Sequence, residues 1–98
     1  MLPFTEKVIN TIQTIPEGYV MTYGSIARES GNPRAARQVA RILHSMSQKY
    51  NLPWHRVINS KGLIAIKDEE TAFHQQQELE REGVTVINRK VNLKEYHW

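Results

Sequence analysis

The sequence predicts a single, mainly α-helical domain with a small β hairpin, of the winged helix-turn-helix type. Its 98 residues allow one compact domain with a modest core, so we expect residues 1–98 to form one unit. Apolar residues recur at helical spacing in two segments, and glycine, proline and capping residues mark the helix ends clearly. Two short apolar segments flank a turn-forming tetrapeptide, which predicts the hairpin.

The first two helices are predicted from periodicity and end signals. Helix one covers about residues 4–14, and Pro16 and Gly18 stop its pattern. Its apolar residues recur at helical spacing: Phe4, Val8, Ile9, Ile12 and Ile15. The segment Tyr19-Val20-Met21 then leads to Thr22, a good N-cap for a second short helix that ends at Gly31.

A third helix is predicted from Pro33, with Asn32 as its N-cap, to about Met46. Its core face is expected to carry Ala36, Val39, Ala40, Leu43 and Met46. Its other face carries Arg34, Arg37, Gln38, Arg41 and Ser45. Two short helices joined at Ser30-Gly31-Asn32, the second rich in arginine, are typical of a helix-turn-helix that enters a DNA groove. The same arginines could instead only solvate an amphipathic helix.

The second half of the chain predicts a hairpin, a helix and a strand. The hairpin strands are His55–Ile58 and Leu63–Ile66, with Asn59-Ser60-Lys61-Gly62 as the turn. A fourth helix runs from about Glu69 to Glu82 and is ended by Gly83. Val84–Ile87 predicts another short strand.

Composition limits the possible chemistry. The formal net charge of +3 favours polyanionic partners but is shared by many proteins without them. The absence of cysteine excludes disulfides, thiolate metal sites and thiol nucleophiles. The four histidines lack metal-ligand spacing, so we expect no metal and no cofactor. Without a signal-peptide pattern or a membrane-length apolar segment, the protein is expected to be cytoplasmic, nucleoid-associated in a prokaryote, with no membrane partner.

A motif in the second half of the chain points to a family. Pro53-Trp54-His55-Arg56-Val57-Ile58 resembles the active-site motif of the O6-alkylguanine-DNA alkyltransferases, with tryptophan in place of the reactive cysteine. That replacement is the mark of the alkyltransferase-like proteins. Three further motifs agree in order and spacing: Ile15-Pro16-Glu17-Gly18, Thr22-Tyr23-Gly24 and Gly31-Asn32-Pro33-Arg34-Ala35-Ala36-Arg37. The resemblance spans about residues 4–83 and is more specific than any single motif.

The resemblance implies a set of DNA-binding residues. The helix-turn-helix would bind through the minor groove, with Arg37 entering the duplex where the target nucleotide has left. Tyr23 would crowd the phosphate beside the target and help to rotate the nucleotide out. Arg34, Gln38 and Arg41 lie on the same polar face. Without the motif, Arg37 would be a plain phosphate contact and Tyr23 a partly buried core residue.

The resemblance also implies a lesion pocket. Trp54 would form a flat apolar wall beside the flipped base, whereas in an arbitrary sequence it would be a core anchor. His55 and Glu82 match the pair that relays a proton in the enzymes, and here they would serve structure or base recognition. Arg56 would brace the loop. Lys67 falls where some relatives place an arginine that probes the O6 face, and it could equally be a solvated lysine.

The function implied is that of a non-enzymatic, monomeric sensor of O6-alkylguanine in double-stranded DNA. It would flip the base and mark the lesion for nucleotide excision repair proteins. Indole offers no nucleophile to accept an alkyl group, so transfer is not expected. Two alternatives remain. One is a helix-turn-helix transcription factor without lesion selectivity, which usually binds as a dimer. The other is an unrelated enzyme, for which only the His55 and Glu82 pair is available.

Overall fold

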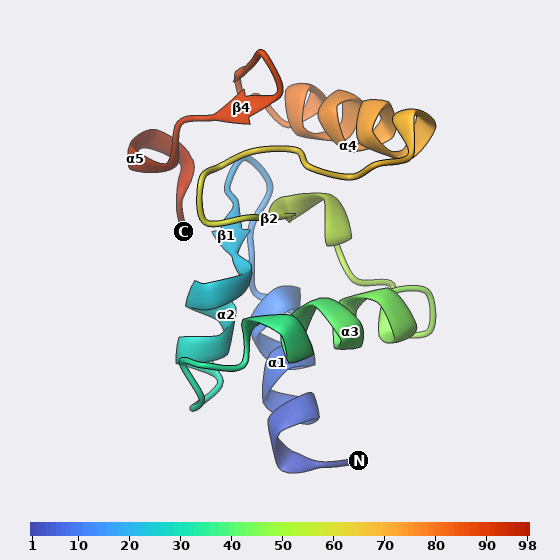
Figure 1. The fold of residues 1–98 in the computed structure, drawn as a ribbon, viewed down its shortest axis with the longest axis vertical. Helices are drawn as coiled ribbons and strands as arrows, with labels where there is room; N and C mark the ends of the chain where they lie inside the picture. Colours follow the sequence, from blue (N-terminus) through green and yellow to red (C-terminus); the bar gives the residue numbers. More distant parts are fainter.

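Helix α1 (Pro3–Gln13) opens the fold in the computed structural model, which describes residues 1–98 (Figure 1). Strand β1 (Met21–Thr22) leads directly into helix α2 (Tyr23–Glu29). Thr22 caps α2 as predicted: its side chain accepts from the Ser25 N–H at 3.1 Å, and the Ser25 hydroxyl accepts from the Thr22 N–H at 3.0 Å. This reciprocal capping box fixes the start of the helix and therefore the position of Tyr23.

Helix α3 (Ala36–Met46) begins at Ala36, so the predicted start at Pro33 is wrong. The reason lies in Asn32, whose side-chain oxygen accepts from the Arg34 N–H at 3.2 Å while its carbonyl accepts from Ala35. These bonds close a turn instead of capping a helix. The assignment of Ala40 to the core face is also wrong, because Ala40 is exposed and Ile42 is buried in its place.

The predicted hairpin is wrong, because His55–Ile58 and Leu63–Ile66 do not pair with each other. Residues Trp54–Arg56 form a short 3-10 helix, η1, and the strand that follows, β2 (Val57–Ile58), pairs in parallel with β1. The chain around Leu63 pairs instead with Lys90, and the Ile64 N–H donates to the Arg89 carbonyl at 2.9 Å. Long-range backbone partners therefore replace the local hairpin.

A hairpin does occur further along the chain. Helix α4 (Glu69–Arg81) ends where Gly83 adopts φ +92°, as predicted, and strands β3 (Val86–Ile87) and β4 (Lys90–Val91) then pair antiparallel. Their two-residue turn places Asn88 and Arg89 at positive φ, as tight hairpin turns require. The short helix α5 (Leu93–Tyr96) follows. No helix is both long and apolar enough to cross a membrane.

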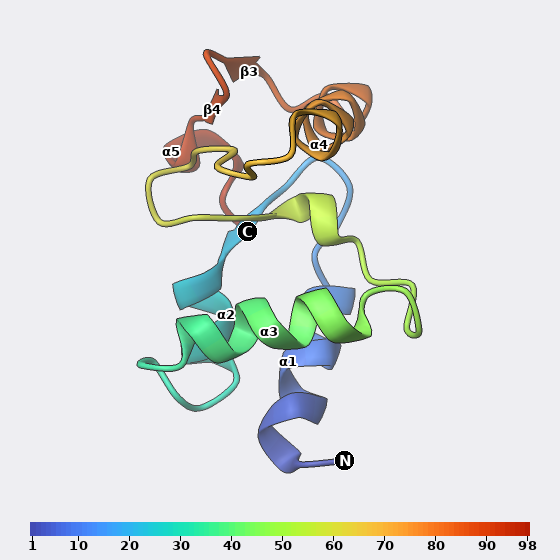
Figure 2. The same ribbon diagram turned by 45° about the vertical axis from the view of Figure 1, so that its right-hand side comes forward.

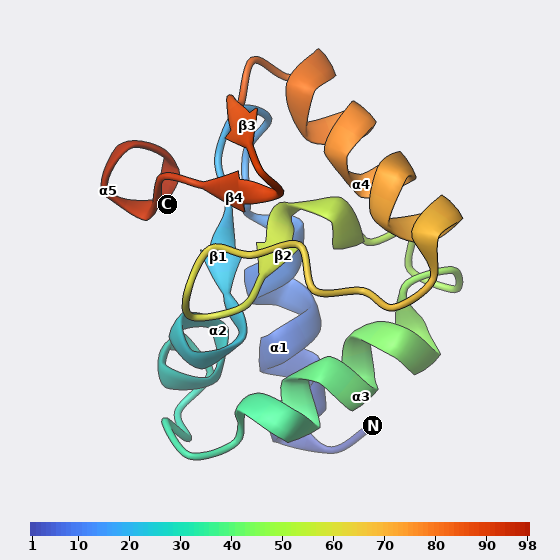
Figure 3. The same ribbon diagram turned by 45° about the horizontal axis from the view of Figure 1, so that its top comes forward.

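The paired strands β1 and β2 lie between two hydrophobic clusters. Figures 1, 2 and 3 show α1, α2 and α3 on one side of the strands, and α4 with the hairpin on the other. Successive strand residues point in opposite directions, so Met21 and Val57 pack with the three helices while Val20 and Ile58 pack with α4. The fold is therefore the predicted mainly helical domain with a small β hairpin, and η1 lies where its two parts meet.

Candidate nucleic-acid interface

The polar face of α3 presents Arg37, Gln38 and Arg41, and Arg34 lies in the turn just before the helix. We call these four residues the arginine face. All four side chains are exposed, and Figure 2 shows α3 running across the outside of α1 and α2. None of the three arginines forms an ion pair within the protein. Their charges are therefore uncompensated by neighbouring carboxylates, as a surface for phosphates requires.

Tyr23 lies at the first turn of α2 beside a small cavity. Its ring packs against the core of the three helices, and burial raises the pKa of its hydroxyl above the usual value. The cavity behind it has a volume of about 140 Å³. The other residues that line it are Val57, Ile58, Asn59, Leu63, Ala65, Ile66 and Gln75. The hollow is thus mainly apolar, with two side-chain amides in its wall.

His55, Arg56 and Glu82 form one hydrogen-bonded cluster. Glu82 lies 2.8 Å from His55 Nε2 and accepts from Arg56 through Nε at 3.0 Å and Nη2 at 2.7 Å. The Gly18 N–H adds a bond of 3.3 Å, and Arg56 Nη1 donates to the Ile15 carbonyl at 2.8 Å. Arg56 therefore braces η1 against both the loop after α1 and the end of α4.

The cluster controls the ionisation of Glu82, whose side chain is only 9% exposed. Burial alone would favour the neutral acid. The hydrogen bonds from Arg56, His55 and Gly18 outweigh burial and lower the pKa of Glu82 from 4.5 to about 2. The folded protein consequently holds this carboxylate ionised under acidic conditions where an unfolded chain would protonate it.

We predict that Glu82 makes the protein acid-sensitive. Because its pKa is lower in the folded chain, its contribution to stability is complete above pH 4.5 and is lost as the pH falls toward 2. Chemical unfolding between pH 7 and pH 2 should show that Glu82→Gln costs on the order of 2 kcal/mol near neutrality and progressively less in acid. The control Glu80→Gln removes an exposed carboxylate from the last turn of α4, two residues before Glu82. A Glu82→Gln cost that stays constant with pH would contradict the prediction.

Trp54 stands at the start of η1 between two histidines. Its ring stacks on His74 of α4, with ring centroids 5.8 Å apart and an interplanar angle of 21°. It meets His55 edge to face, with centroids 6.4 Å apart. Trp54 and His74 together line two adjoining clefts of about 670 and 380 Å³. Trp54 is thus half-buried, packed on the core and open to the surface beside α4.

Two further residues shape this region, Gln75 and His74, and neither is among the residues predicted from the sequence. Gln75 is only 3% exposed, and its side-chain nitrogen donates to the carbonyls of His55 and Val57 at 3.1 and 3.0 Å. His74 carries the stack on Trp54. A sequence signal existed for Gln75, because Ala72, Gln75 and Leu79 share the buried side of α4 at helical spacing. No such signal marks His74.

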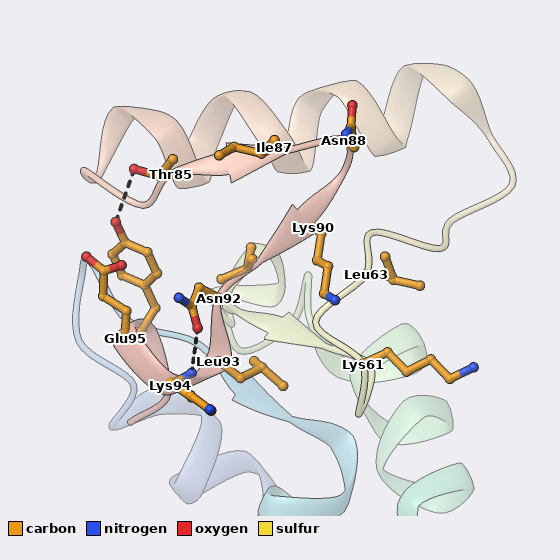
Figure 4. A pocket seen from close by; sticks show the side chains of 12 residues that line it. Lys61, Leu63, Thr85, Ile87, Asn88, Lys90, Asn92, Leu93, Lys94 and Glu95 are labelled. Atoms are coloured by element: carbon orange, nitrogen blue, oxygen red, sulfur yellow. Dashed lines mark hydrogen bonds between the residues drawn. The ribbon is translucent and has the colours of Figure 1, made fainter.

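The predicted residues are only partly brought together. The fold joins Trp54, His55, Arg56 and Glu82 in one region. Lys67 is exposed and lines neither the clefts beside Trp54 nor the cavity behind Tyr23. A further hollow of about 650 Å³ lies between the hairpin and α5 (Figure 4), and none of the predicted site residues lines it.

Comparison with known proteins places this geometry in a family. Residues 3–84 match the family described as 6-O-methylguanine DNA methyltransferase, DNA binding domain. A DNA base-flipping protein of Escherichia coli (strain K12) is 42% identical over 96 residues, which cover 97% of this chain and 74% of that protein. Alkyltransferase-like protein 1 of Schizosaccharomyces pombe is 42% identical over 101 residues, 97% and 94% of the two chains.

Solved structures of related proteins support the same family assignment. S. pombe Atl1 in complex with damaged DNA containing O6-carboxymethylguanine matches with a TM-score of 0.86 at 42% identity, over 97% of this chain and 94% of that chain. An O6-methylguanine methyltransferase of Mycobacterium tuberculosis matches with a TM-score of 0.66 at 28% identity, over 84% and 49% of the chains. This chain therefore belongs to the family of the 6-O-methylguanine DNA methyltransferase DNA-binding domain, as an alkyltransferase-like member.

Proposed function

We propose that this protein binds O6-alkylguanine in duplex DNA, flips the base out of the helix and leaves its alkyl group in place. The observation that carries the proposal is Trp54, which stands in an otherwise complete alkyltransferase motif where the enzymes have their nucleophile. An indole cannot accept an alkyl group, but its flat apolar face can contact one. Recognition therefore remains while transfer is lost.

The arginine face and Tyr23 supply the means of flipping. Extruding a base costs a few kcal/mol, which a side chain that fills the vacated space can partly offset. Arg37 is exposed, unpaired and long enough to stack on neighbouring bases. We infer that α3 enters the minor groove with Arg37 in this role. Tyr23, which lines an apolar cavity, then crowds the target phosphate.

The proposed outcome of binding is a marked lesion. A protein that holds a flipped base without repairing it leaves the lesion in place and presents distorted DNA to other proteins. We propose that nucleotide excision repair proteins take over this complex and that the sensor binds as a monomer. The names of the relatives, a base-flipping protein and an alkyltransferase-like protein, support base flipping, the step that precedes this handover.

The test follows both the base and the alkyl group. A duplex with one O6-methylguanine and a fluorescent base analogue beside it is mixed with excess protein, and the DNA is then digested and its nucleosides are quantified. We expect the analogue's fluorescence to rise as the stack opens and O6-methylguanine to be recovered in full. Loss of the methyl group, or release of a free base, would overturn the non-enzymatic proposal.

Trp54 should contribute to lesion discrimination more than to general DNA affinity. Trp54→Ala is predicted to lower the ratio of affinities for O6-methylguanine and guanine duplexes about tenfold, because the apolar wall is removed. Trp54→Phe should retain most of that ratio. Trp98→Ala is the matched control, since Trp98 packs against Tyr19 outside this site. Titrations monitored by fluorescence anisotropy measure the ratio. An unchanged ratio in Trp54→Ala would show that Trp54 does not contact the alkylated base.

A further inference from the structure

The stack between Trp54 and His74 is the most exposed aromatic contact of the site. Trp54 starts a three-residue 3-10 helix without a side-chain cap, so its indole is oriented by what packs on it. His55, one of its neighbours, is fixed by Glu82. His74, the other, forms no hydrogen bond or ion pair within the protein. The contact of His74 with Trp54 is therefore its one specific interaction.

The placement of His74 over Trp54 follows from its neighbour in sequence. The Gln75 amide donates both to His55 and to Val57, the carbonyls that bracket the C-terminal end of η1. These two bonds, one of them buried, fix α4 against the backbone of the Pro53 motif. Because Gln75 faces inward, His74, the residue before it, lies at the exposed edge of α4 and stacks on the indole of Trp54. The stack is thus a consequence of how α4 is anchored.

We propose that His74 is a positioning residue for lesion recognition: it holds the Trp54 indole as the wall between the two clefts and so sets the discrimination between alkylated and unmodified guanine. This inference rests on the function proposed above. A planar partner limits rotation of the indole and covers one of its faces. The face left uncovered is then presented in a constant orientation to an incoming alkyl group, which lowers the entropy lost on binding.

The experiment compares His74→Ala with His74→Phe, which keeps a planar ring. The discrimination ratio is measured with O6-methylguanine and guanine duplexes. We expect His74→Ala to lower the ratio about threefold to tenfold and His74→Phe to stay within about twofold of wild type. Affinity for the guanine duplex should remain unchanged in both. Gln76→Ala is the control, a neutral substitution on α4 at a residue that lines neither cleft.

A second measurement reports on Trp54 without DNA. In a Trp98→Phe background Trp54 is the sole tryptophan, and His74→Ala should increase its quenching by acrylamide while His74→Phe should not. Unchanged discrimination in His74→Ala would overturn the role of His74, as would an equal loss in both variants, which would indicate a need for the imidazole itself. A wild-type protein that does not discriminate would overturn the proposed function, and the quenching result would still report separately on the stack.

Discussion

Replacing Arg37 with alanine should weaken binding to an O6-methylguanine duplex about 30-fold, equivalent to about 2 kcal/mol. Arg37 is exposed on α3 and has no partner within the protein, so the substitution should not disturb the fold. The loss arises because nothing then fills the space left by the extruded nucleotide. Equilibrium titration against lesion and guanine duplexes measures it.

Arg41→Ala is the matched control for this prediction. It removes the same charge from the same helix one turn further on. Arg41→Ala should reduce the salt dependence of binding by about one unit of slope, because it loses one phosphate-directed cation, and Arg37→Ala should reduce it by no more than that. Only Arg37→Ala should also lose lesion preference. Equal losses on both duplexes in Arg37→Ala would mean that Arg37 is merely another phosphate contact.

Replacing Arg56 with alanine should have the largest effect on stability. Its side chain is 14% exposed and joins Glu82 to the carbonyl of Ile15. Removing one partner of a buried ion pair costs about 3–5 kcal/mol, because the other charge is left without compensation. In a protein of this size, such a loss lowers Tm by more than about 12 °C. Calorimetry or thermal circular dichroism measures the shift.

An exposed arginine supplies the comparison. Arg81 is 74% exposed and pairs with Glu78 at 3.3 Å within α4. Arg81→Ala should cost less than about 1 kcal/mol, since solvent screens such surface pairs. Arg56→Lys should recover only part of the loss, because a lysine cannot reproduce the fork that holds Glu82 and Ile15 together. Similar Tm values for Arg56→Ala and Arg81→Ala would show that the cluster does not stabilise the fold.

Local sequence signals predicted the helix ends correctly where a single residue determines the position at which the helix begins or ends. Thr22 caps α2, and Gly31 and Gly83 take positive φ beyond the ends of α2 and α4. The start of α3 was misplaced because an asparagine before proline can either cap a helix or close a turn. Only the folded backbone decides between these, and here Asn32 closes a turn.

The strands were harder to predict because their partners are distant in sequence. Val57 and Ile58 form a strand as predicted, but they pair with Met21 and Thr22. The predicted strand Val84–Ile87 contains β3 (Val86–Ile87). Its partner β4 has only two residues, too few for an alternating pattern to identify. Helix α5 and the tail after it, which bonds to Val20, gave no sequence signal.

The candidate site was predictable as far as the motif extends. Trp54, His55 and Arg56 are adjacent in sequence, and Glu82 was assigned by resemblance and lies within hydrogen-bond distance of His55. His74 was not identified, because its contact with Trp54 depends on the packing of α4 against η1. Lys67 is the least supported residue, since it lines none of the hollows near Trp54.

Lesion-selective binding without repair is best tested by comparing two duplexes that differ in a single methyl group. Purified protein is titrated with one duplex containing O6-methylguanine and one containing guanine at the same salt concentration, and the bound DNA is then recovered and analysed. We predict tighter binding to the methylated duplex, with its methyl group intact. Equal affinity for the two duplexes would contradict lesion sensing and would indicate a general helix-turn-helix DNA-binding protein.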